Sequence, residues 1–262
     1  MDGLLDDYHS FVEACKVFIQ KRGITMDIKI KLLMKSYDQL VLNNINLNLS
    51  DCKAVAIIGK SGCGKSTLLR LMTGIEQSDS GEIEINDHHL GKEDLRVYQK
   101  SISMVFQKHN LFPHLSLLKN ITLILDRVHK MDTEVAMKKA EDLLTSLQLK
   151  DQMHKRPDQV SGGQAQRASI ARALATDPEI IFMDEPTAAL DPILTKEVLE
   201  AVKTLKSRGT QFAFVTHELS FARQFADYVV YIDNGKIVEE GPDILDNPST
   251  EALKLFLENE RV

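Results

Sequence analysis

One nine-residue segment limits what this chain can fold into more than any other feature. The run GKSGCGKST at residues 59–67 fits the pattern G-x-x-x-x-G-K-[ST] from Gly59 to Ser66. Its glycines allow successive backbone N–H groups to curl around phosphate oxygens, because no Cβ stands in the way. An apolar, strand-like run (AVAII) comes before the segment, and a helical pattern follows from Leu68. This order of strand, turn and helix predicts a phosphate-binding loop.

The loop would bring a cation, a hydroxyl group and a helix end to the same anion. A helix beginning near Lys65 turns the positive end of its dipole toward the phosphates. The Lys65 ammonium can reach the β- and γ-phosphates of a nucleotide, and the Ser66 hydroxyl can be a ligand of Mg²⁺. The residues expected to bind the nucleotide are Gly59, Lys60, Ser61, Gly62, Cys63, Gly64, Lys65, Ser66 and Thr67.

Two adjacent acids follow the apolar run IIFM. Such a run is typical of a strand that is buried on both faces of a parallel sheet. Asp184, at the carboxyl end of this strand, is placed to hold Mg²⁺ directly or through water. Glu185 would face the γ-phosphate and polarise the attacking water as a general base. By themselves the two acids could equally cap a strand that Pro186 ends, but the phosphate loop favours the catalytic interpretation.

The order of the remaining elements predicts the fold class. Short β-type runs fill the chain from Met26 to the phosphate loop, and ISMVF at 102–106 reads as another strand. The pattern is helical almost throughout 115–176, and strands and helices alternate after residue 179. We predict an α/β protein: a phosphate-loop NTPase core with a mainly parallel sheet, an N-terminal antiparallel β part and an inserted helical subdomain at about 115–176.

Two segments show the 3.6-residue period of an amphipathic helix. The first lies within residues 4–19, with Gly23 as its stop. Met26 could be the biological start, so residues 1–25 are either an upstream artefact or a real helix docked on the body or on a partner. The second is capped by Asp132 or Thr133. Its apolar positions are Val135, Ala136, Ala140, Leu143, Leu144 and Leu147.

Composition excludes several classes of protein. The chain has 32 Lys and Arg against 38 Asp and Glu, a formal charge of −6, which argues against an electrostatically driven nucleic-acid binder. Cys15, Cys52 and Cys63 form neither a disulfide framework nor a metal knuckle, which favours a reducing compartment. No apolar run approaches the ~18 residues that cross a bilayer, and the acidic start lacks the features of a signal peptide. These features predict a soluble, cytosolic protein.

A second motif connects the chain to a known family. The run VSGGQ at 160–164, followed by AQRASIARAL, resembles the signature motif of ABC-transporter ATPases. Ser161 and the two glycines after it would open a helix and offer further N–H donors to phosphate. The resemblance extends from about Met26 to the C-terminus. The family's order of motifs is also matched by the phosphate loop, Gln107, the signature, Asp184 with Glu185, Asp191 and His217.

The resemblance implies roles for three further residues. Tyr37 resembles the aromatic residue that stacks on adenine. Gln107 resembles the glutamine that touches Mg²⁺ and water while reporting to the membrane partner. His217 resembles the histidine that contacts the γ-phosphate and orients the attacking water. Taken singly, each would more often be a core, loop or structural residue.

The resemblance also implies an assembly. Residues of the signature in a second chain would close the nucleotide site, so that the working unit is a head-to-tail homodimer. Hydrolysis of ATP with Mg²⁺ would drive integral-membrane permease subunits docked near Gln107 and the LFPHL segment that follows it. The implied nucleotide-binding residues outside the loop are Tyr37, Gln107, Ser161, Gly162, Gly163, Gln164 and Asp191, and the implied metal ligands are Ser66, Gln107 and Asp184.

Three segments narrow the choice within the family: HNLFPHLSLLKNI, KMDTEVAMKKAEDLL and NGKIVEEGPDILDNPSTEALKLFL look most like importers of polar amino acids. This resemblance implies a subunit at the cytoplasmic face of the inner membrane that works indirectly with a periplasmic substrate-binding protein and not with nucleic acid. A DNA clamp would need long coiled coils, and no heptads persist here over three or four repeats. A ribosome-associated ABC ATPase would usually carry two cassettes, whereas one phosphate loop is present. An exporter or lipid-extraction subunit shares the same cassette and stays open as the alternative.

Overall fold

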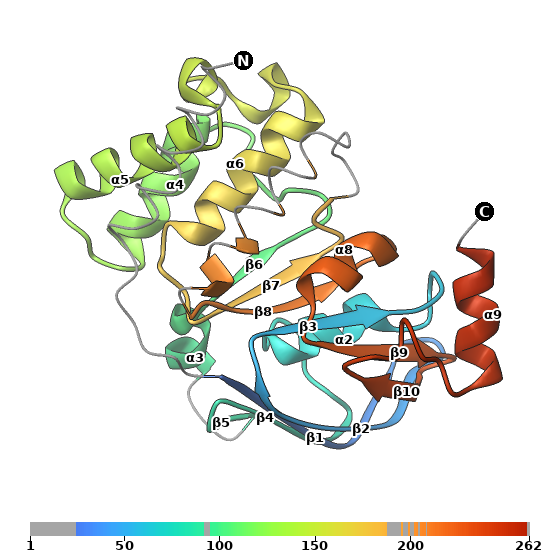
Figure 1. The fold of residues 1–262 in the computed structure, drawn as a ribbon. Helices are drawn as coiled ribbons and strands as arrows, with labels where there is room; N and C mark the ends of the chain where they lie inside the picture. The colour runs from blue at the N-terminus through green and yellow to red at the C-terminus, as the bar shows by residue number, and fades with distance from the viewer. Residues whose placement is uncertain are drawn as a thin grey trace. The chain divides into compact units, whose positions relative to one another are not determined.

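The computed structural model describes residues 25–91, 95–187, 195, 199, 202–203, 205–207 and 209–260. The helix predicted within 4–19, the boundary at residue 25 and Asp191 therefore lie outside the described residues or at their edge. The chain divides into two compact units, which are described separately (Figure 1). The described parts of 103–181 and 186–210 form the helical unit. Those of 25–102, 182–185 and 211–260 form the β-rich unit.

The β-rich unit contains an antiparallel sheet with the strand order β2-β1-β4-β5. Its strands are β1 (Met26–Ser36), β2 (Leu40–Cys52), β4 (Ser80–Ile85) and β5 (His88–Leu90). In the first half of β1, Met26, Ile28 and Ile30 are buried and the residues between them are exposed, which is the pattern of a sheet with one face on the core. Asn86 and Asp87 have φ values of 47° and 67°, as a tight two-residue hairpin between β4 and β5 requires. The predicted N-terminal antiparallel part is thus confirmed.

A second sheet has the order β10-β9-β3-β8-β7-β6. Its strands are β3 (Ala54–Ile58), β6 (Ile102–Val105), β7 (Ile180–Asp184), β8 (Gln211–Val215), β9 (Tyr228–Asp233) and β10 (Lys236–Gly241). β3 pairs in parallel with both β8 and β9, while β10 is antiparallel to β9. Every residue of β3, β7 and β8 is buried, as expected for the central strands of a parallel sheet. This confirms the predicted α/β core.

Three helices of the helical unit pack on one another (Figure 1). They are α4 (Leu117–Arg127), α5 (Thr133–Ser146) and α6 (Gly162–Leu174). The prediction of helix almost throughout 115–176 is wrong for the stretch between α5 and α6, which holds only two 3₁₀ turns. Gln148, with φ of 57°, ends α5, and Pro157 supplies no backbone N–H to a helix.

The predicted apolar stripe of α5 needs one correction. Asp132 is the N-cap, and its carboxylate accepts hydrogen bonds from the backbone N–H groups of Glu134 and Val135, as predicted. The alanines and leucines of the stripe are buried, but Val135 is 54% exposed. It precedes Ala136 by one residue, or about 100° around the helix, and therefore lies at the margin of the stripe.

The β-rich unit is completed by four helices: α2 (Lys65–Met72), α3 (Leu95–Ser101), α8 (Leu219–Phe225) and α9 (Glu251–Asn259). Phe221 and Phe225 of α8 pack against Phe212 and Phe214 of β8, with ring centroids 5.0–5.5 Å apart. The described residues from 195 to 207, which belong to the helical unit, are helical. None of the described helices combines the length and the apolar character that crossing a membrane requires.

Glu239 fastens α9 to β10, and this contact predicts a pH-dependent stability. Burial would raise the pKa of its carboxyl group, but hydrogen bonds from Ser249 N (2.7 Å), Thr250 N (2.9 Å) and the Thr250 hydroxyl outweigh burial and lower the pKa to about 2. Because this pKa lies below the ordinary 4.5, the contribution is present above pH 4.5 and is lost as the pH falls to 2. Glu239→Gln should lower the free energy of unfolding by about 1 kcal/mol at pH 7. The effect is this small because the Glu239 side chain is partly exposed and water screens its charge.

Urea titrations at pH 7 and pH 3 provide the measurement. The difference between Glu239→Gln and the wild type should shrink at the lower pH. Glu258→Gln on the exposed side of α9 is the control and should have little effect at either pH. An effect of Glu239→Gln that does not change with pH would contradict the assignment of this stability to the ionised carboxylate.

Candidate functional site

The phosphate-loop segment connects β3 to α2, and close approach of the backbone explains two of its glycines. A Cβ on Gly59 would lie 2.1 Å from the Ile232 carbonyl oxygen. A Cβ on Gly64 would lie 2.6 Å from a methyl group of Leu42, and Gly64 also has φ of 106°. A side chain at position 59 would displace the backbone of the strand that contains Ile232, and at position 64 the positive φ favours glycine in addition to the contact with Leu42.

The helix after the loop begins at Lys65, three residues before the helical pattern seen from Leu68. Ser66 and Thr67 therefore belong to the first turn of α2, whose free N–H groups point toward the loop. Of the nine loop residues, Lys60, Ser61 and Gly62 are exposed, Gly59, Cys63, Gly64 and Lys65 are buried, and Ser66 and Thr67 are half-buried. The loop thus exposes residues 60–62 to solvent, while the stretch from Cys63 to Lys65 that leads into the helix is buried.

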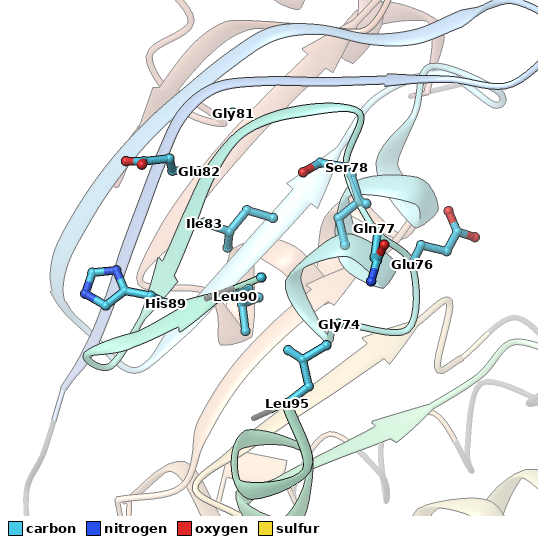
Figure 2. A pocket seen from close by; sticks show the side chains of 12 residues that line it. Gly74, Glu76, Gln77, Ser78, Gly81, Glu82, Ile83, His89, Leu90 and Leu95 are labelled. Atoms are coloured by element: carbon cyan, nitrogen blue, oxygen red, sulfur yellow. The ribbon is translucent and has the colours of Figure 1, made fainter. Parts of the chain in front are cut away.

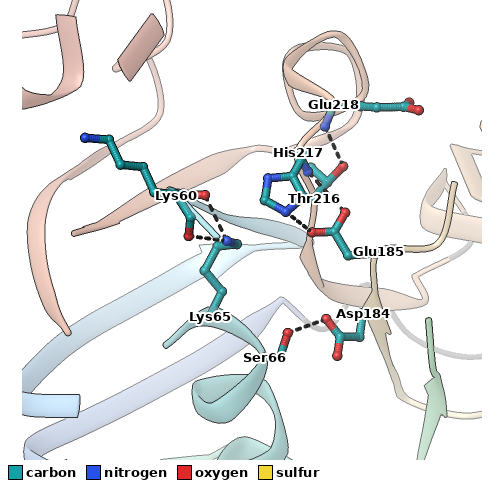
Figure 3. A network of polar contacts seen from close by, with 9 residues as sticks. Lys60, Lys65, Ser66, Asp184, Glu185, Thr216, His217 and Glu218 are labelled. Carbon is teal, nitrogen blue, oxygen red and sulfur yellow. Dashed lines mark hydrogen bonds and ion pairs between the residues drawn. The ribbon is translucent and has the colours of Figure 1, made fainter. Parts of the chain in front are cut away.

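Lys65 is the buried cation of the loop, with 5% of its surface exposed. Its ammonium donates hydrogen bonds to the carbonyl oxygens of Gly59 and Lys60, each at 2.8 Å (Figure 3). A buried charge needs such partners, and phosphate oxygens would be stronger ones than neutral carbonyls. Figure 3 shows that the side chain of Lys60 extends away from Lys65, so the two lysines of this loop differ in position as well as in burial.

Ser66 and Asp184 meet at the end of β7. The Ser66 hydroxyl donates a hydrogen bond of 2.7 Å to Asp184 Oδ1, and Asp184 is buried (Figure 3). A hydroxyl and a carboxylate are the hard oxygen ligands that Mg²⁺ prefers. The part of the chain that the structure describes contains no group of three or more His, Cys, Asp or Glu that could hold a metal. The chemistry of the Ser66–Asp184 pair fits a magnesium ion that would take its other ligands from substrate phosphates and water.

Glu185 has an unusual backbone for its residue type. Its φ is 52°, in the left-handed region, and its N–H donates a 3.0 Å hydrogen bond to the Val215 carbonyl oxygen of β8. For a residue other than glycine this backbone conformation is unfavourable in free energy, and residues held in it concentrate at functional sites. Burial raises the pKa of the Glu185 carboxyl to about 7, although the His217 backbone N–H and the charge of Lys65 oppose the shift.

His217, directly after β8 and Thr216, contacts both oxygens of this carboxylate. Its Nε2 lies 2.9 Å from Glu185 Oε1, and its backbone N–H donates to Oε2 at 3.2 Å (Figure 3). Burial, with the charge of Lys65, lowers the pKa of the ring below its usual 6.5. A neutral ring with its proton on Nε2 can donate to Glu185 and leave the carboxylate able to accept a proton. The pair has the composition of a general base and its orienting partner.

The signature residues lie in the helical unit, apart in the chain from the phosphate loop of the β-rich unit. Ser161 is the N-cap of α6: its hydroxyl accepts from Gln164 N at 3.2 Å, and Gln164 Oε1 accepts from Ser161 N at 3.0 Å. Ser161 and Gly162 are exposed, and a Cβ on Gly162 would meet no atom within 4 Å. The predicted helix start with accessible N–H donors is present, but its role in a nucleotide site stays a prediction.

The other residues implied by the family lie in different places. Gln107 is exposed and follows β6 by two residues in the helical unit. Tyr37 is exposed in the turn between β1 and β2 of the β-rich unit. Asp191 lies outside the described residues. The structure therefore brings together Lys65, Ser66, Asp184, Glu185 and His217, and it leaves the roles of Gln107, Tyr37 and Asp191 as predictions.

Sequence reasoning did not single out Gln166, which the structure places among functional segments. Gln166 is buried on α6, its amide donates to the Pro186 carbonyl oxygen at 3.0 Å, and its Oε1 contacts His109 Nδ1. It thus joins the segment after Gln107 to the residue after Glu185. The sequence signal that could have identified it is a glutamine among the alanines of the helical run after the signature motif.

A parallel strand, a glycine-rich loop, a helix with a buried lysine, and acids at the end of a second strand define a phosphate-loop nucleotide-binding protein. The sequence model of the family described as "ABC transporter" matches residues 42–188. The chain belongs to this family of ATPases, and its predicted membership is confirmed.

Similar proteins in this family are ATP-binding subunits. The arginine transport ATP-binding protein ArtM of Bacillus subtilis (strain 168) is 42% identical over 236 residues, which are 88% of this chain and 98% of that protein. The glutamine transport ATP-binding protein GlnQ of Escherichia coli (strain K12) is 42% identical over 226 residues, 84% of this chain and 93% of that protein. A dimeric structure of the ATP-binding cassette MJ0796 bound to ADP and Pi has a TM-score of 0.77 at 33% identity, covering 82% of this chain and 98% of that one.

Proposed function

We propose that this chain is the ATP-hydrolysing subunit of a bacterial-type ABC importer for polar amino acids. The observation that carries the proposal is the contact between Glu185 and His217, which lies beside the Ser66–Asp184 pair next to a loop that can hold phosphates. The names of similar proteins support import of amino acids rather than export or lipid extraction. ArtM and GlnQ are named for the transport of arginine and glutamine, and a further relative, TcyC of Bacillus subtilis (strain 168), 41% identical to this chain, is named for the import of L-cystine.

The proposed reaction is in-line attack of water on the γ-phosphorus of ATP. Glu185 accepts a proton from the attacking water, the new P–O bond forms, and the bond to the oxygen that bridges the β- and γ-phosphates breaks. Lys65 and the N–H groups of α2 hold the phosphates, so catalysis is mostly positioning and charge stabilisation. Mg²⁺, held by Ser66 and Asp184, would neutralise charge on the β- and γ-phosphate oxygens. His217 keeps the carboxylate of Glu185 in place.

The proposed working assembly is a head-to-tail homodimer on the cytoplasmic face of the inner membrane. Ser161, Gly162, Gly163 and Gln164 of the second chain would supply N–H and hydroxyl donors to the ATP on the first. The dimeric structures of the similar cassette MJ0796 support the formation of a dimer. Permease subunits would bind outside the nucleotide site, with a periplasmic binding protein acting indirectly through them.

Transport in vesicles tests the proposal. The chain should copurify with a polytopic membrane subunit, and vesicles containing the complex should take up a labelled polar amino acid only with ATP and the binding protein. The same complex carrying Glu185→Gln is the matched control and should not sustain uptake. A complex that moves its substrate out of the cytoplasmic compartment, or copurifies with no membrane subunit, would reject the proposal in favour of export or a non-transport role.

The segment from Gln107 to Leu115 should contact the permease. Hydrogen bonds to the buried side chain of Asn120 order the C-terminal part of this segment. The Asn120 amide oxygen accepts from Phe112 N at 2.7 Å, and its amide nitrogen donates to the carbonyl oxygens of Phe112 and Ser116. Phe112 and its ring neighbour His114 are exposed. Single cysteines at exposed positions of this segment should therefore crosslink to the membrane subunit in the assembled transporter.

The control is a cysteine at an exposed position elsewhere in the helical unit, such as Lys150→Cys, which should crosslink poorly. Efficient crosslinking at Lys150→Cys with none between 107 and 115 would show that the permease binds another surface.

A further inference from the structure

Tyr37 presents an aromatic ring to solvent, with 54% of the residue exposed. One face of this ring already has a partner, because Lys35 Nζ lies 5.2 Å from the ring centroid. That distance is within the range of a cation–π contact. A planar ligand that stacks on Tyr37 must therefore use the opposite face.

The segment that follows α2 holds the residues around Tyr37. Lys35 Nζ donates a 2.8 Å hydrogen bond to the Gln77 carbonyl oxygen and lies 3.4 Å from Asp79 Oδ1. The other carboxylate oxygen of Asp79 accepts from Ser36 N at 2.6 Å. The short segment from Gln77 to Asp79 thus fixes both the Lys35 ammonium, which lies against the ring, and the main chain just before Tyr37.

Glu76, four residues after the end of α2, completes this set of contacts. One of its carboxylate oxygens accepts a hydrogen bond from the Tyr37 hydroxyl, and the other lies 3.6 Å from Arg70 Nη1. The Glu76 N–H also donates to the Arg70 carbonyl oxygen at 3.3 Å, so its main chain is attached to the last turn of the helix. Glu76 lies at the edge of a cavity of about 320 Å³, and Figure 2 shows its carboxylate pointing away from Ile83 and the other side chains that line the cavity.

We propose that Glu76 is a positioning residue that orients the ring of Tyr37, through its hydroxyl, for stacking on the nucleotide base. The proposal rests on the ATP-binding function proposed above and on the role that the family resemblance implies for Tyr37, which is to stack on adenine. A ring that is already ordered does not lose its rotamer freedom on binding, so more of the stacking free energy appears as affinity. Lys65 and Ser66 lie in the first turn of α2, and Glu76 is hydrogen-bonded to its last turn. Glu76 therefore connects the base-binding ring to the same helix that carries the phosphate-binding residues.

ADP and inorganic pyrophosphate, both titrated with Mg²⁺, separate the base from the phosphates. Glu76→Ala should weaken ADP binding about three- to tenfold, the value of one hydrogen bond, and leave pyrophosphate binding unchanged. Tyr37→Phe, which removes only the hydroxyl, should have the same effect. In the double variant Glu76→Ala should add nothing, because the hydroxyl through which Glu76 acts is gone. Glu76→Gln keeps an acceptor oxygen and should recover most of the affinity.

Glu84→Ala is the matched control, since it removes an acid of the neighbouring strand β4 that pairs with Lys29 and not with Tyr37. A purely structural role for Glu76 would weaken ADP and pyrophosphate alike, or add its full effect to Tyr37→Phe, and either result would overturn the inference. Tyr37→Ala distinguishes a wrong role for Glu76 from a wrong position for the base-binding site. It should weaken ADP roughly 5- to 100-fold through lost stacking, and no effect would mean that Tyr37 does not bind the base.

Discussion

Glu185→Gln should lower the rate of ATP turnover by about 10²- to 10⁴-fold, or roughly 3–5 kcal/mol of barrier, while ATP affinity stays close to that of the wild type. The substitution keeps the size of the side chain and an oxygen that can accept from His217, but it removes the group that takes the proton of the attacking water. Lys65, Ser66 and the loop N–H groups, which hold the phosphates in the proposed site, are unchanged. The substitution should therefore slow the hydrolysis of bound ATP and leave ATP binding unchanged.

Steady-state phosphate release and equilibrium titration with ATP give the two measurements. Gel filtration with ATP and Mg²⁺ should also show a dimer that accumulates for Glu185→Gln, because the closed state can no longer hydrolyse its nucleotide. Glu218→Gln is the matched control: it removes a nearby acid whose carboxylate points away from Glu185 and His217 in Figure 3. Turnover of Glu185→Gln near the wild-type rate would mean that another group is the base.

Lys65→Ala should weaken ATP binding by about a hundredfold or more. Removing one partner of a buried, hydrogen-bonded charge pair typically costs about 2–5 kcal/mol, and here the partner would be the β- and γ-phosphates. Lys60→Ala is a control from the same loop, because this lysine is exposed and its ammonium points away from Lys65 (Figure 3). We expect it to change the affinity by a few-fold at most.

Equilibrium titration with ATP, together with a thermal melt to verify folding, is the measurement. Affinity of a folded Lys65→Ala protein equal to that of the wild type would remove Lys65 from the site. Equal losses in the Lys60→Ala and Lys65→Ala variants would point to the net charge of the loop rather than to a specific contact.

Local pattern and spacing were sufficient to predict several parts of the structure. The buried strands β3 and β7 read as uninterrupted apolar runs, and the glycine pattern located the loop between β3 and α2. Asp184 and Glu185 could be assigned to the end of a strand because an apolar run stops there. Each of these features depends only on residues that are close in sequence.

Features that depend on long-range packing could not be predicted in the same way. The contact of Glu185 with His217, and the burial that raises the pKa of its carboxyl group, require β7 and β8 to be neighbours. The hydrogen bond between Tyr37 and Glu76 likewise joins residues from two separate elements. The exposure of Val135 depends on which part of α5 the neighbouring helices cover, and periodicity alone does not fix that margin.

The left-handed backbone of Glu185 has a consequence for how this position can change over time. Glycine and asparagine adopt this conformation at less cost than glutamate does, so either would relieve the local backbone. Backbone strain alone would therefore favour replacing the glutamate, and under the proposed mechanism the need to hydrolyse ATP opposes that drift. A descendant of this chain that no longer hydrolysed ATP could accept glycine or asparagine at position 185. The residue found at that position would then indicate whether hydrolysis is still under selection.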